Sequence, residues 1–283
     1  MPELPEVETI KRGAGNLIVN KTIKDIEVCA KKLFIGNPND ALGAKIIDIK
    51  RVAKVLELVL NNNKEILMHM KMTGQIVFQP KGKEISCAVG GHMQKAYGQR
   101  LPHKHTHIIY TFSDGSKLYF NDLRKFGWNR IVSQKEAKKI LSREHFGPEP
   151  LSKDFTLDYL KTIFLKTNKK IKEILTDQSK IAGIGNIYAN DALYWAGILP
   201  SRPAKSLSEN EISKLKSGIE KVINLGLKYG GSSENTYVNI EGKRGHYMDF
   251  AALYQQKLDP KGHPVQRQKI AGRPAFFCPI CQK

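Results

Sequence analysis

The sequence predicts an α+β fold in which strands occupy the first half of the chain and helices the third quarter. Segments rich in β-branched or alternating apolar residues come before residue 122, and segments with apolar residues three and four positions apart follow residue 132. The chain has 283 residues, of which 41% are hydrophobic. That is enough for a buried core in two domains or in one large domain.

The first expected element is a helix that begins near Pro5. Proline suits the first helical position, and Glu6 and Glu8 suit the positive end of the helix dipole. The apolar stripe of this helix consists of Val7, Ile10, Ala14 and Leu17.

Strands are expected around residues 22–28, 45–60, 65–70 and 107–121. Within the last segment, Asp114-Gly115 is the signal of a tight β-hairpin. These strands predict a sandwich or a flattened barrel. The stretch 80–102 is rich in Gly, Lys and Gln and has little apolar periodicity, so it is interpreted as a long loop that a ligand could order.

Helices are expected after residue 132. A linker helix is predicted at 133–141, followed by a Gly-Pro breaker at 147–150 and by helices at 156–166, 169–176 and 186–196. Ser208 and Glu211 form a capping box that opens a long helix. The inward-facing residues of this helix are Ile212, Leu215, Ile219, Val222 and Ile223.

The N-terminus carries a candidate nucleophile. If Met1 is removed, Pro2 presents a free secondary amine, and amines that add to carbonyl carbon are covalent catalysts. The pKa of an α-amino group is about 8, well below that of lysine, so much more of it is neutral and nucleophilic at neutral pH. Glu3 and Glu6 could supply proton transfers. On these residues alone, a helix start is the simpler interpretation.

The charge balance points to a polyanionic partner. Lys and Arg total 46 against 27 acidic residues, a formal net charge of +19. Nucleic acid is the leading partner, while a lysine-rich surface that only improves solubility remains an alternative. No basic amphipathic helix that would favour a membrane surface stands out. The sequence shows no apolar run of transmembrane length and no signal peptide, so a soluble intracellular protein is expected.

Two turns and one glycine-rich segment carry side chains suited to DNA. Arg124 and Phe126 follow a strand, and Met72 ends another, so these side chains could fill the space left when a base leaves the stack. Asn186 closes a glycine-rich turn at a helix start, where a phosphate could bind. Each feature alone would more often be core packing or a capped helix hairpin.

Several spaced motifs together resemble those of bacterial formamidopyrimidine-DNA glycosylases, in the same order. They are Pro2-Glu3-Leu4-Pro5-Glu6-Val7-Glu8-Thr9, the Met72 turn, and the segments 104–107, 122–127, 177–190 and 278–283. The resemblance runs from residue 2 to the C-terminus.

The resemblance implies roles for individual residues. Pro2 would attack C1′ of the damaged nucleotide, Glu3 would protonate the sugar, and Glu6 would be the second carboxylate near the nucleophile. Lys54, otherwise an ordinary strand lysine, would serve β-elimination, and Arg273 would contact DNA and serve δ-elimination.

Further residues match the family's DNA contacts. Met72, Arg124 and Phe126 would fill the void left by the extruded base, and the phosphate-contacting positions would be His105, Lys172 and Asn186. The segment 242–247 looks like the loop that covers a flipped oxidised purine.

The resemblance also refines the fold. It implies an α+β protein with an N-terminal β-sandwich and flanking helices, a C-terminal helix-two-turn-helix domain and a finger-like β-hairpin. The expected divisions are a catalytic domain at 1–132, a linker at 133–153, the helix-two-turn-helix domain at 154–236, and the lesion-capping loop and hairpin at 237–283.

One departure concerns metal binding. The family usually closes its hairpin with four cysteines on zinc, whereas here Cys278 and Cys281 remain and the first pair is replaced by Leu258 and Lys261. Asp259 or His263 could substitute, but a hairpin without zinc is predicted. Its expected apolar contacts are Val265, Ile270, Phe276 and Phe277. No cofactor is required, and zinc is doubtful.

The resemblance therefore implies a bifunctional DNA glycosylase and abasic-site lyase that excises oxidised purines such as 8-oxoguanine and formamidopyrimidines. Its partner would be double-stranded DNA with oxidised bases or abasic sites, and it would act as a cytoplasmic, nucleoid-associated monomer. The alternatives are an endonuclease VIII-type enzyme for oxidised pyrimidines and a non-catalytic protein that binds damaged DNA.

Overall fold

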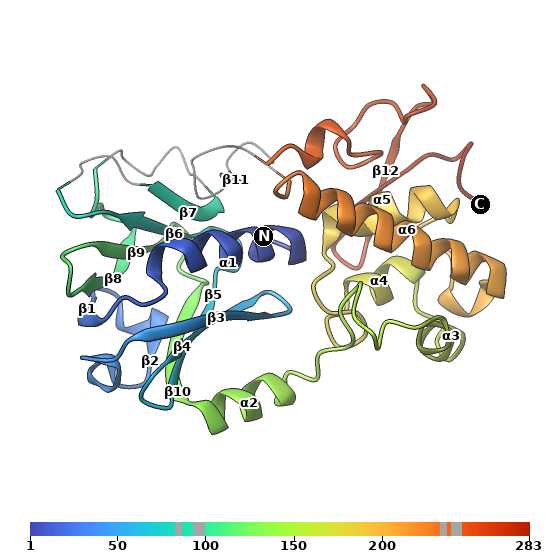
Figure 1. The fold of residues 1–283 in the computed structure, drawn as a ribbon. Helices are drawn as coiled ribbons and strands as arrows, with labels where there is room; N and C mark the ends of the chain where they lie inside the picture. The colour runs from blue at the N-terminus through green and yellow to red at the C-terminus, as the bar shows by residue number, and fades with distance from the viewer. Residues whose placement is uncertain (83–86, 93–99, 233–236, 239–244) are drawn as a thin grey trace. The chain divides into compact units, whose positions relative to one another are not determined.

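The computed structural model describes residues 1–82, 87–92, 100–232, 237–238 and 245–283. The chain divides into two compact units (Figure 1). Unit 1 comprises Met1–Arg143 and Ser233–Gly245, and unit 2 comprises Glu144–Ser232 and His246–Lys283. The expected linker helix thus belongs to unit 1, and the chain returns to unit 1 after residue 232. The four-part division expected from the sequence stays a prediction.

Unit 1 contains two β-sheets. In order, the six-stranded sheet consists of β1 (Ile23–Val28), β8 (Thr106–Phe112), β9 (Lys117–Asp122), β6 (Gly74–Gln79), β7 (Cys87–His92) and β11 (Tyr237–Val238). The five-stranded sheet consists of β2 (Phe34–Ile35), β10 (Trp128–Ser133), β5 (Lys64–His69), β4 (Val55–Leu60) and β3 (Ile46–Val52). The pairs are antiparallel, apart from the parallel pair β2 and β10.

One hydrophobic core joins the two sheets. Leu56 and Leu58 of β4 lie in the same buried cluster as Ile108 and Tyr110 of β8. Alternate strand residues point to one face, so each sheet contributes every second residue to this core. Helix α1 (Leu4–Ile18) adds its apolar stripe, with Ile18 fully buried and Leu17 partly buried. The predicted N-terminal sandwich is confirmed.

Five strands were not expected from the sequence: β2, β6, β7, β10 and β11. The predicted loop at 80–102 contains β7, which pairs with β6 on one side and β11 on the other. Gly90 and Gly91 give this strand little side-chain pattern, and its partner β11 is almost 150 positions away. The strand therefore forms through pairing with β6 and β11 that the local sequence does not indicate.

The predicted helices are present, and helix α2 (Gln134–Arg143) packs on β5 and β10 in unit 1. Unit 2 contains α3 (Leu157–Leu165), α4 (Ile171–Thr176), α5 (Asn186–Ala196) and α6 (Glu209–Lys228), followed by the hairpin of β12 (Gln266–Ile270) and β13 (Arg273–Phe277). Short 3₁₀ turns occur at η1 (Lys31–Leu33), η2 (Pro38–Ala41), η3 (Ala204–Ser206) and η4 (Tyr247–Asp249).

Helix α6 starts at the predicted capping box and packs closely on α5. The Ser208 hydroxyl accepts the Glu211 N–H at 3.3 Å, and the Glu211 carboxylate accepts the Ser208 N–H at 2.8 Å. Gly218 faces α5 so closely that a Cβ there would lie 2.7 Å from the carbonyl oxygen of Ala192. Glycine therefore sets the spacing of these two helices. No helix in the described part of the chain has the length and hydropathy of a membrane span.

Candidate active site

The N-terminal turn of unit 1 holds three of the predicted catalytic residues. Pro2, Glu3 and Glu6 are buried at the start of α1. The backbone N–H of Glu3 donates to the Glu6 carboxylate at 2.8 Å, and the Val7 N–H donates to the Glu3 carbonyl at 3.0 Å. Glu6 therefore fixes the backbone that carries Glu3 and Pro2. Met1 precedes Pro2 in this chain, so the Pro2 nitrogen is here part of a peptide bond.

Lys54 lies in the tight turn between β3 and β4. Its side chain is only 4% exposed, and Ala53 before it has a positive φ of 52°. Arg51 holds the turn, because it donates to the Ala53 carbonyl at 2.9 Å and to Glu8 of α1 at 3.0 Å. Burial alone would raise the pKa of Glu8, but its hydrogen bonds with Arg51 and Arg12 lower it. The Lys54 turn is thus attached to the first helix.

His69 lies at the start of the turn that carries Met72. Burial, with the charges of Lys71 and Lys54, lowers the pKa of His69 to about 3. The ring is therefore neutral, and its Nδ1 accepts the Lys71 N–H at 2.9 Å. Lys71 has a positive φ of 50°, and Met72 beyond it is 44% exposed. A neutral histidine thus shapes the turn that projects Met72.

Asp122 joins the Met72 turn to the 123–127 loop. Its buried carboxylate accepts hydrogen bonds from the Thr73 hydroxyl, from the Arg124 N–H at 3.2 Å and from the Gly127 N–H at 2.7 Å. Gly74 at the start of β6 pairs with Asp122 at the end of β9. The two turns therefore meet where β9 ends and β6 begins, at one edge of the six-stranded sheet.

Arg124 and Phe126 project from this edge. The Arg124 guanidinium lies 4.7 Å from the centre of the Phe126 ring, which is 54% exposed. His105 adjoins the same loop, because its carbonyl accepts the Asp122 N–H at 3.0 Å. Burial and the charges of Lys104 and Lys125 lower the pKa of His105. The structure thus brings together Met72, His105, Arg124 and Phe126.

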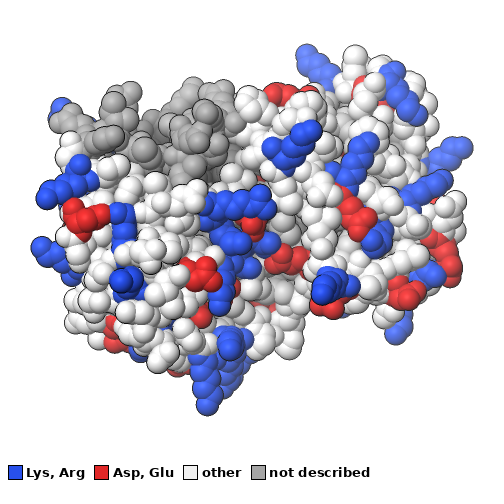
Figure 2. Space-filling model, viewed as in Figure 1, with Lys and Arg blue, Asp and Glu red and all other residues white. Residues whose placement is uncertain are grey.

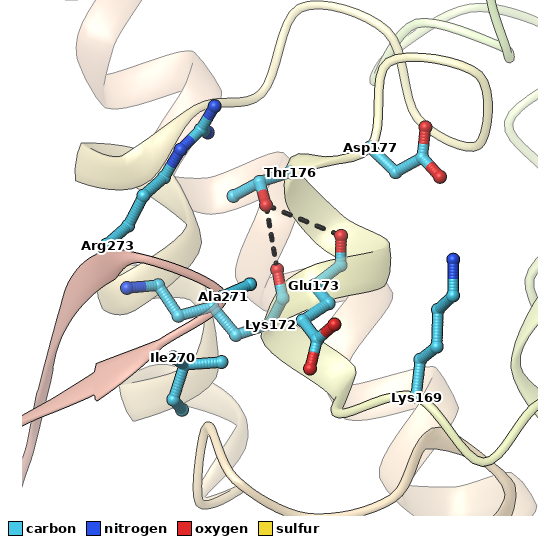
Figure 3. A pocket seen from close by; sticks show the side chains of 8 residues that line it. All are labelled: Lys169, Lys172, Glu173, Thr176, Asp177, Ile270, Ala271 and Arg273. Atoms are coloured by element: carbon cyan, nitrogen blue, oxygen red, sulfur yellow. Dashed lines mark hydrogen bonds between the residues drawn. The ribbon is translucent and has the colours of Figure 1, made fainter.

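The remaining predicted site residues lie in unit 2, where a pocket separates α4 from the hairpin turn (Figure 3). Arg273 starts β13 after Ala271 and Gly272, which have positive φ of 45° and 77°. Figure 3 shows Arg273 on the hairpin side of the pocket and Lys169 on the other side of α4. Both residues are exposed, so the pocket presents cations to solvent. It is lined by Lys169, Lys172, Glu173, Thr176, Asp177, Ile270, Ala271 and Arg273.

Lys172, which the resemblance places at a phosphate contact, is buried in this structure. Its side chain is 2% exposed, and its Nζ donates to the carbonyl oxygen of Pro274 in β13. A buried ammonium needs such partners, since leaving it unpaired is costly. The observed contact therefore joins α4 to the hairpin, beside Arg273.

Asn186 is the first residue of α5, at the end of the glycine-rich turn. The Gln178 side chain clamps that turn, accepting the Gly183 N–H at 2.9 Å and donating to the Ile184 carbonyl at 2.8 Å. Asn186 is partly buried, and within the described ranges its Oδ1 has no protein hydrogen-bond partner. A helix N-terminus favours an anion here, which agrees with the predicted phosphate position.

Several supporting residues were missed in the sequence. The turns at the sheet edge are held by hydrogen bonds of Asp122, Thr73 and His69. The Lys54 turn is held by the ion pair of Glu8 and Arg51. An aspartate directly after a strand and before a polar turn is the signal that could have identified Asp122. The Thr73–Asp122 and Glu8–Arg51 contacts join residues far apart in the chain, so no local pattern indicates them.

The hairpin base contains a possible metal-binding group. Asp259, His263, Cys278 and Cys281 place one ligand atom each within 4.8 Å of one another. Two sulfurs, one imidazole nitrogen and one carboxylate oxygen are donors that zinc takes in four-coordinate sites. These residues fit zinc in kind and in number. The sequence left zinc binding doubtful, and these four residues are the ones that would bind it.

Basic side chains are spread over the viewed surface of each unit, with acidic side chains among them (Figure 2). This distribution accords with the formal net charge of +19. Such a surplus favours polyanionic partners and makes binding sensitive to salt.

Comparisons with known proteins cover the whole chain. Residues 1–129 match the formamidopyrimidine-DNA glycosylase N-terminal domain, and residues 146–238 match the formamidopyrimidine-DNA glycosylase H2TH domain. The chain is 35% identical over 293 residues to the formamidopyrimidine-DNA glycosylase of Geobacillus kaustophilus and 37% identical over 291 residues to that of Carboxydothermus hydrogenoformans, with 100% of each chain covered.

Solved structures of Lactococcus lactis FPG match as well. A variant in complex with DNA containing Fapy-dG gives a TM-score of 0.87 at 29% identity, and the wild type in complex with DNA containing an oxidised pyrimidine gives 0.86 at 29% identity. Each match covers 100% of both chains. These matches confirm the α+β fold with its H2TH domain and C-terminal hairpin. On these full-length similarities, the chain belongs to the formamidopyrimidine-DNA glycosylase family.

Proposed function

We propose that this protein is a DNA glycosylase that removes oxidised purines, such as 8-oxoguanine and formamidopyrimidines, from double-stranded DNA and then cuts the abasic site as a lyase. One observation carries the proposal. Pro2 and Glu3 lie in a buried turn held by the Glu6 carboxylate, at the start of a chain that matches this family from end to end. A relative bound to Fapy-dG DNA supports the choice of an oxidised purine.

The proposed chemistry starts from the form without Met1. The lone pair of the Pro2 amine forms a bond to C1′, and the bond from C1′ to the base breaks with its electron pair going to the base. The amine nitrogen passes its proton to the departing base. Glu3 then donates a proton to O4′ as the C1′–O4′ bond breaks, and the nitrogen lone pair forms the iminium between Pro2 and C1′. Glu6 positions this turn through its contact with the Glu3 N–H.

The strand is then cut by elimination. Loss of a proton from C2′ expels the 3′ phosphate, and Lys54 is the proposed base for this step. Water then hydrolyses the iminium and releases Pro2. Arg273 is proposed to contact the backbone and to assist a second elimination at the 5′ side. Lys54 and Arg273 belong to different compact units, and their roles are proposals for the complex with DNA.

DNA recognition is proposed to use the exposed sheet edge of unit 1 and the turns of unit 2. Met72, Arg124 and Phe126 would enter the space of the extruded base, because side chains inserted there replace lost stacking. His105 and Asn186 would contact phosphates. The ammonium of Lys172 binds Pro274, so its proposed contribution is to hold the Arg273 hairpin beside the phosphate site.

Reduction with borohydride in the presence of abasic DNA tests the enzyme proposal. Borohydride reduces the iminium to a stable amine, so wild-type protein lacking Met1 should form a covalent adduct of protein and DNA. The variant Pro2→Gly should weaken or abolish the adduct. Pro5→Ala is a matched control, since it removes a proline from the same turn without touching the terminal amine.

The same experiment distinguishes a non-catalytic DNA-binding protein. Mass spectrometry first confirms that the N-terminus of the wild-type protein is Pro2. If this protein then binds the DNA but yields no adduct, the result would favour the non-catalytic DNA-binding protein. An undiminished adduct in Pro2→Gly would show that the secondary amine of Pro2 is not required, and peptide mapping of the adduct would then identify the amine that reacts.

A second substrate class follows from one specific observation. Lactococcus lactis FPG, which matches this chain with a TM-score of 0.86, is seen with DNA containing an oxidised pyrimidine. Comparing kcat/KM on duplexes containing 8-oxoguanine and thymine glycol separates the two classes. We expect the oxidised purine to be preferred, and a preference for thymine glycol would assign the endonuclease VIII-type activity instead.

A further inference from the structure

Four potential metal ligands meet at the open end of the hairpin that carries Arg273. Asp259 and His263 precede β12, whereas Cys278 and Cys281 follow β13. The cluster thus lies between the two chain segments that enter and leave the hairpin. The proposed glycosylase chemistry uses none of these four side chains.

The distances between donor atoms suit a tetrahedral ion. The Cys281 sulfur lies 3.2 Å from Asp259 Oδ2 and 3.3 Å from His263 Nδ1, and these last two atoms are 3.2 Å apart. Zinc bonds of about 2.0–2.3 Å in a tetrahedron separate neighbouring ligand atoms by about 3.3–3.8 Å. All four donor atoms lie within 4.8 Å of one another, so movements of about 1 Å would bring them to the separations of a tetrahedral site.

The Asp259 side of the cluster is held in place by its own turn. Asp259 Oδ1 accepts the N–H groups of Lys261 and His263, both at 2.8 Å, and the Asp259 N–H donates to the His263 carbonyl at 2.8 Å. Gly262 provides the positive φ of 83° that the turn needs. With Oδ1 occupied, Oδ2 is directed to the cluster, as outer hydrogen bonds orient metal ligands.

The cysteine side is equally fixed. Cys278 is fully buried, its N–H donates to Gln282 Oε1 at 2.7 Å, and Gln282 Nε2 donates to the Ile198 carbonyl at 2.7 Å. The Cys281 N–H lies 3.4 Å from the Cys278 sulfur. Tyr194 and Leu253 pack in the same apolar cluster as Cys278. This shell limits access of water to the Cys278 sulfur, while Cys281 is partly exposed.

We propose that Asp259, His263, Cys278 and Cys281 bind one Zn²⁺ ion and thereby tie together both ends of the hairpin. Two sulfurs and an imidazole favour zinc over Mg²⁺ or Ca²⁺, which take oxygen ligands. The proposal departs from the sequence-based prediction of a hairpin without zinc. Leu258 and Lys261 occupy the positions matched to the missing cysteines, but the fold brings their neighbours Asp259 and His263 to the remaining pair.

The metal content of the wild-type protein is the first test. The full chain is expressed in zinc-supplemented medium, purified with a reductant, and measured by elemental mass spectrometry and by X-ray absorption at the zinc edge. We expect close to one zinc per chain with two sulfur and two nitrogen or oxygen neighbours. A zinc content far below one, or bound zinc without sulfur neighbours, would overturn the proposal.

Variants locate the ion. Competition with a coloured chelator should show affinity for zinc reduced by about 100-fold in Cys281→Ala and by about 10-fold or more in Asp259→Asn. The matched control is Cys29→Ala, which removes an exposed thiol from unit 1 and should leave affinity unchanged. Wild-type affinity in Cys281→Ala would place the zinc elsewhere.

A measurement on the wild type covers the case in which a variant fails to fold. Chelator-treated protein titrated with Co²⁺ should develop a thiolate-to-cobalt charge-transfer band and the visible bands of tetrahedral cobalt. Removal of zinc should also speed hydrogen exchange in residues 266–277 while α6 is unaffected. Absence of the charge-transfer band would mean that the four groups form only a hydrogen-bonded cluster.

Discussion

Asp122 organises two turns with a single buried carboxylate. It accepts hydrogen bonds from Thr73 in one turn and from Arg124 and Gly127 in the other, at the edge that projects Met72 and Phe126. A charged acceptor with several donors contributes more than a neutral one. The positions of the exposed side chains therefore depend on a residue that never reaches the surface.

The variant Asp122→Asn tests this dependence. The amide would turn an N–H₂ group toward donors that need an acceptor, so we expect a loss of about 2–3 kcal/mol in the free energy of unfolding. Urea unfolding measures it. Asp25→Asn, at an exposed position on β1, is the control and should change stability by less than about 0.5 kcal/mol. Equal effects of the two variants would contradict the role assigned to Asp122.

Glu57 predicts a pH dependence of stability. Burial, followed by the nearby Glu65 carboxylate, raises the pKa of Glu57 to about 7, and Lys50 opposes this shift. The folded state therefore holds the proton more tightly than the unfolded state. This contribution is fully present below the ordinary pKa near 4.5 and is lost as pH rises through 7.

Replacing Glu57 with Gln removes this titration. The free energy of unfolding of Glu57→Gln minus that of the wild type should be about 1–3 kcal/mol larger at pH 8 than at pH 5. Urea unfolding at the two pH values checks the difference. The same difference at both pH values would show that Glu57 titrates normally in the folded protein.

At the scale of elements, the contact between α5 and α6 depends on one glycine. A Cβ at Gly218 would meet the carbonyl oxygen of Ala192 at 2.7 Å, a backbone atom that cannot rotate away. We expect Gly218→Ala to lower the free energy of unfolding by about 1–3 kcal/mol, because the helices must separate.

Gly15→Ala is the matched control for this prediction. Gly15 lies within α1, and a Cβ there would meet nothing within 4 Å. This substitution should stabilise the protein by about 0.5–1 kcal/mol, because alanine loses less conformational freedom in a helix. Thermal or urea unfolding measures the stability of both variants. A Gly218→Ala variant that is more stable than wild type would refute the close packing of α5 and α6.

At the scale of the whole molecule, the charge surplus governs binding to DNA. With a net charge of +19, the logarithm of affinity should fall linearly with the logarithm of salt concentration. Arg273→Ala should weaken binding and make the slope shallower by about one unit, since one phosphate contact is lost. Fluorescence anisotropy at several salt concentrations measures both. An unchanged slope would remove Arg273 from the proposed backbone contacts.

How much could be predicted from the sequence varies with the range of the interactions. The start of α6 was predictable, because Ser208 and Glu211 are three positions apart and the cap depends only on them. Strand β7 was not, because it pairs with β11, far along the chain. Likewise, the motif around Arg124 was visible, while the Thr73–Asp122 contact spans 49 positions.

The sequence was sufficient to predict the helices, the capping box of α6, most of the strands, the charge, and the order of motifs that indicates the family. Two features became visible in the folded chain alone. Lys172 is buried against Pro274, 102 positions away, and Asp259 and His263 meet Cys278 and Cys281. The physical reason is distance along the chain. Capping, periodicity and charge depend on neighbouring residues, whereas the partners of a buried ammonium or thiol depend on how whole elements pack.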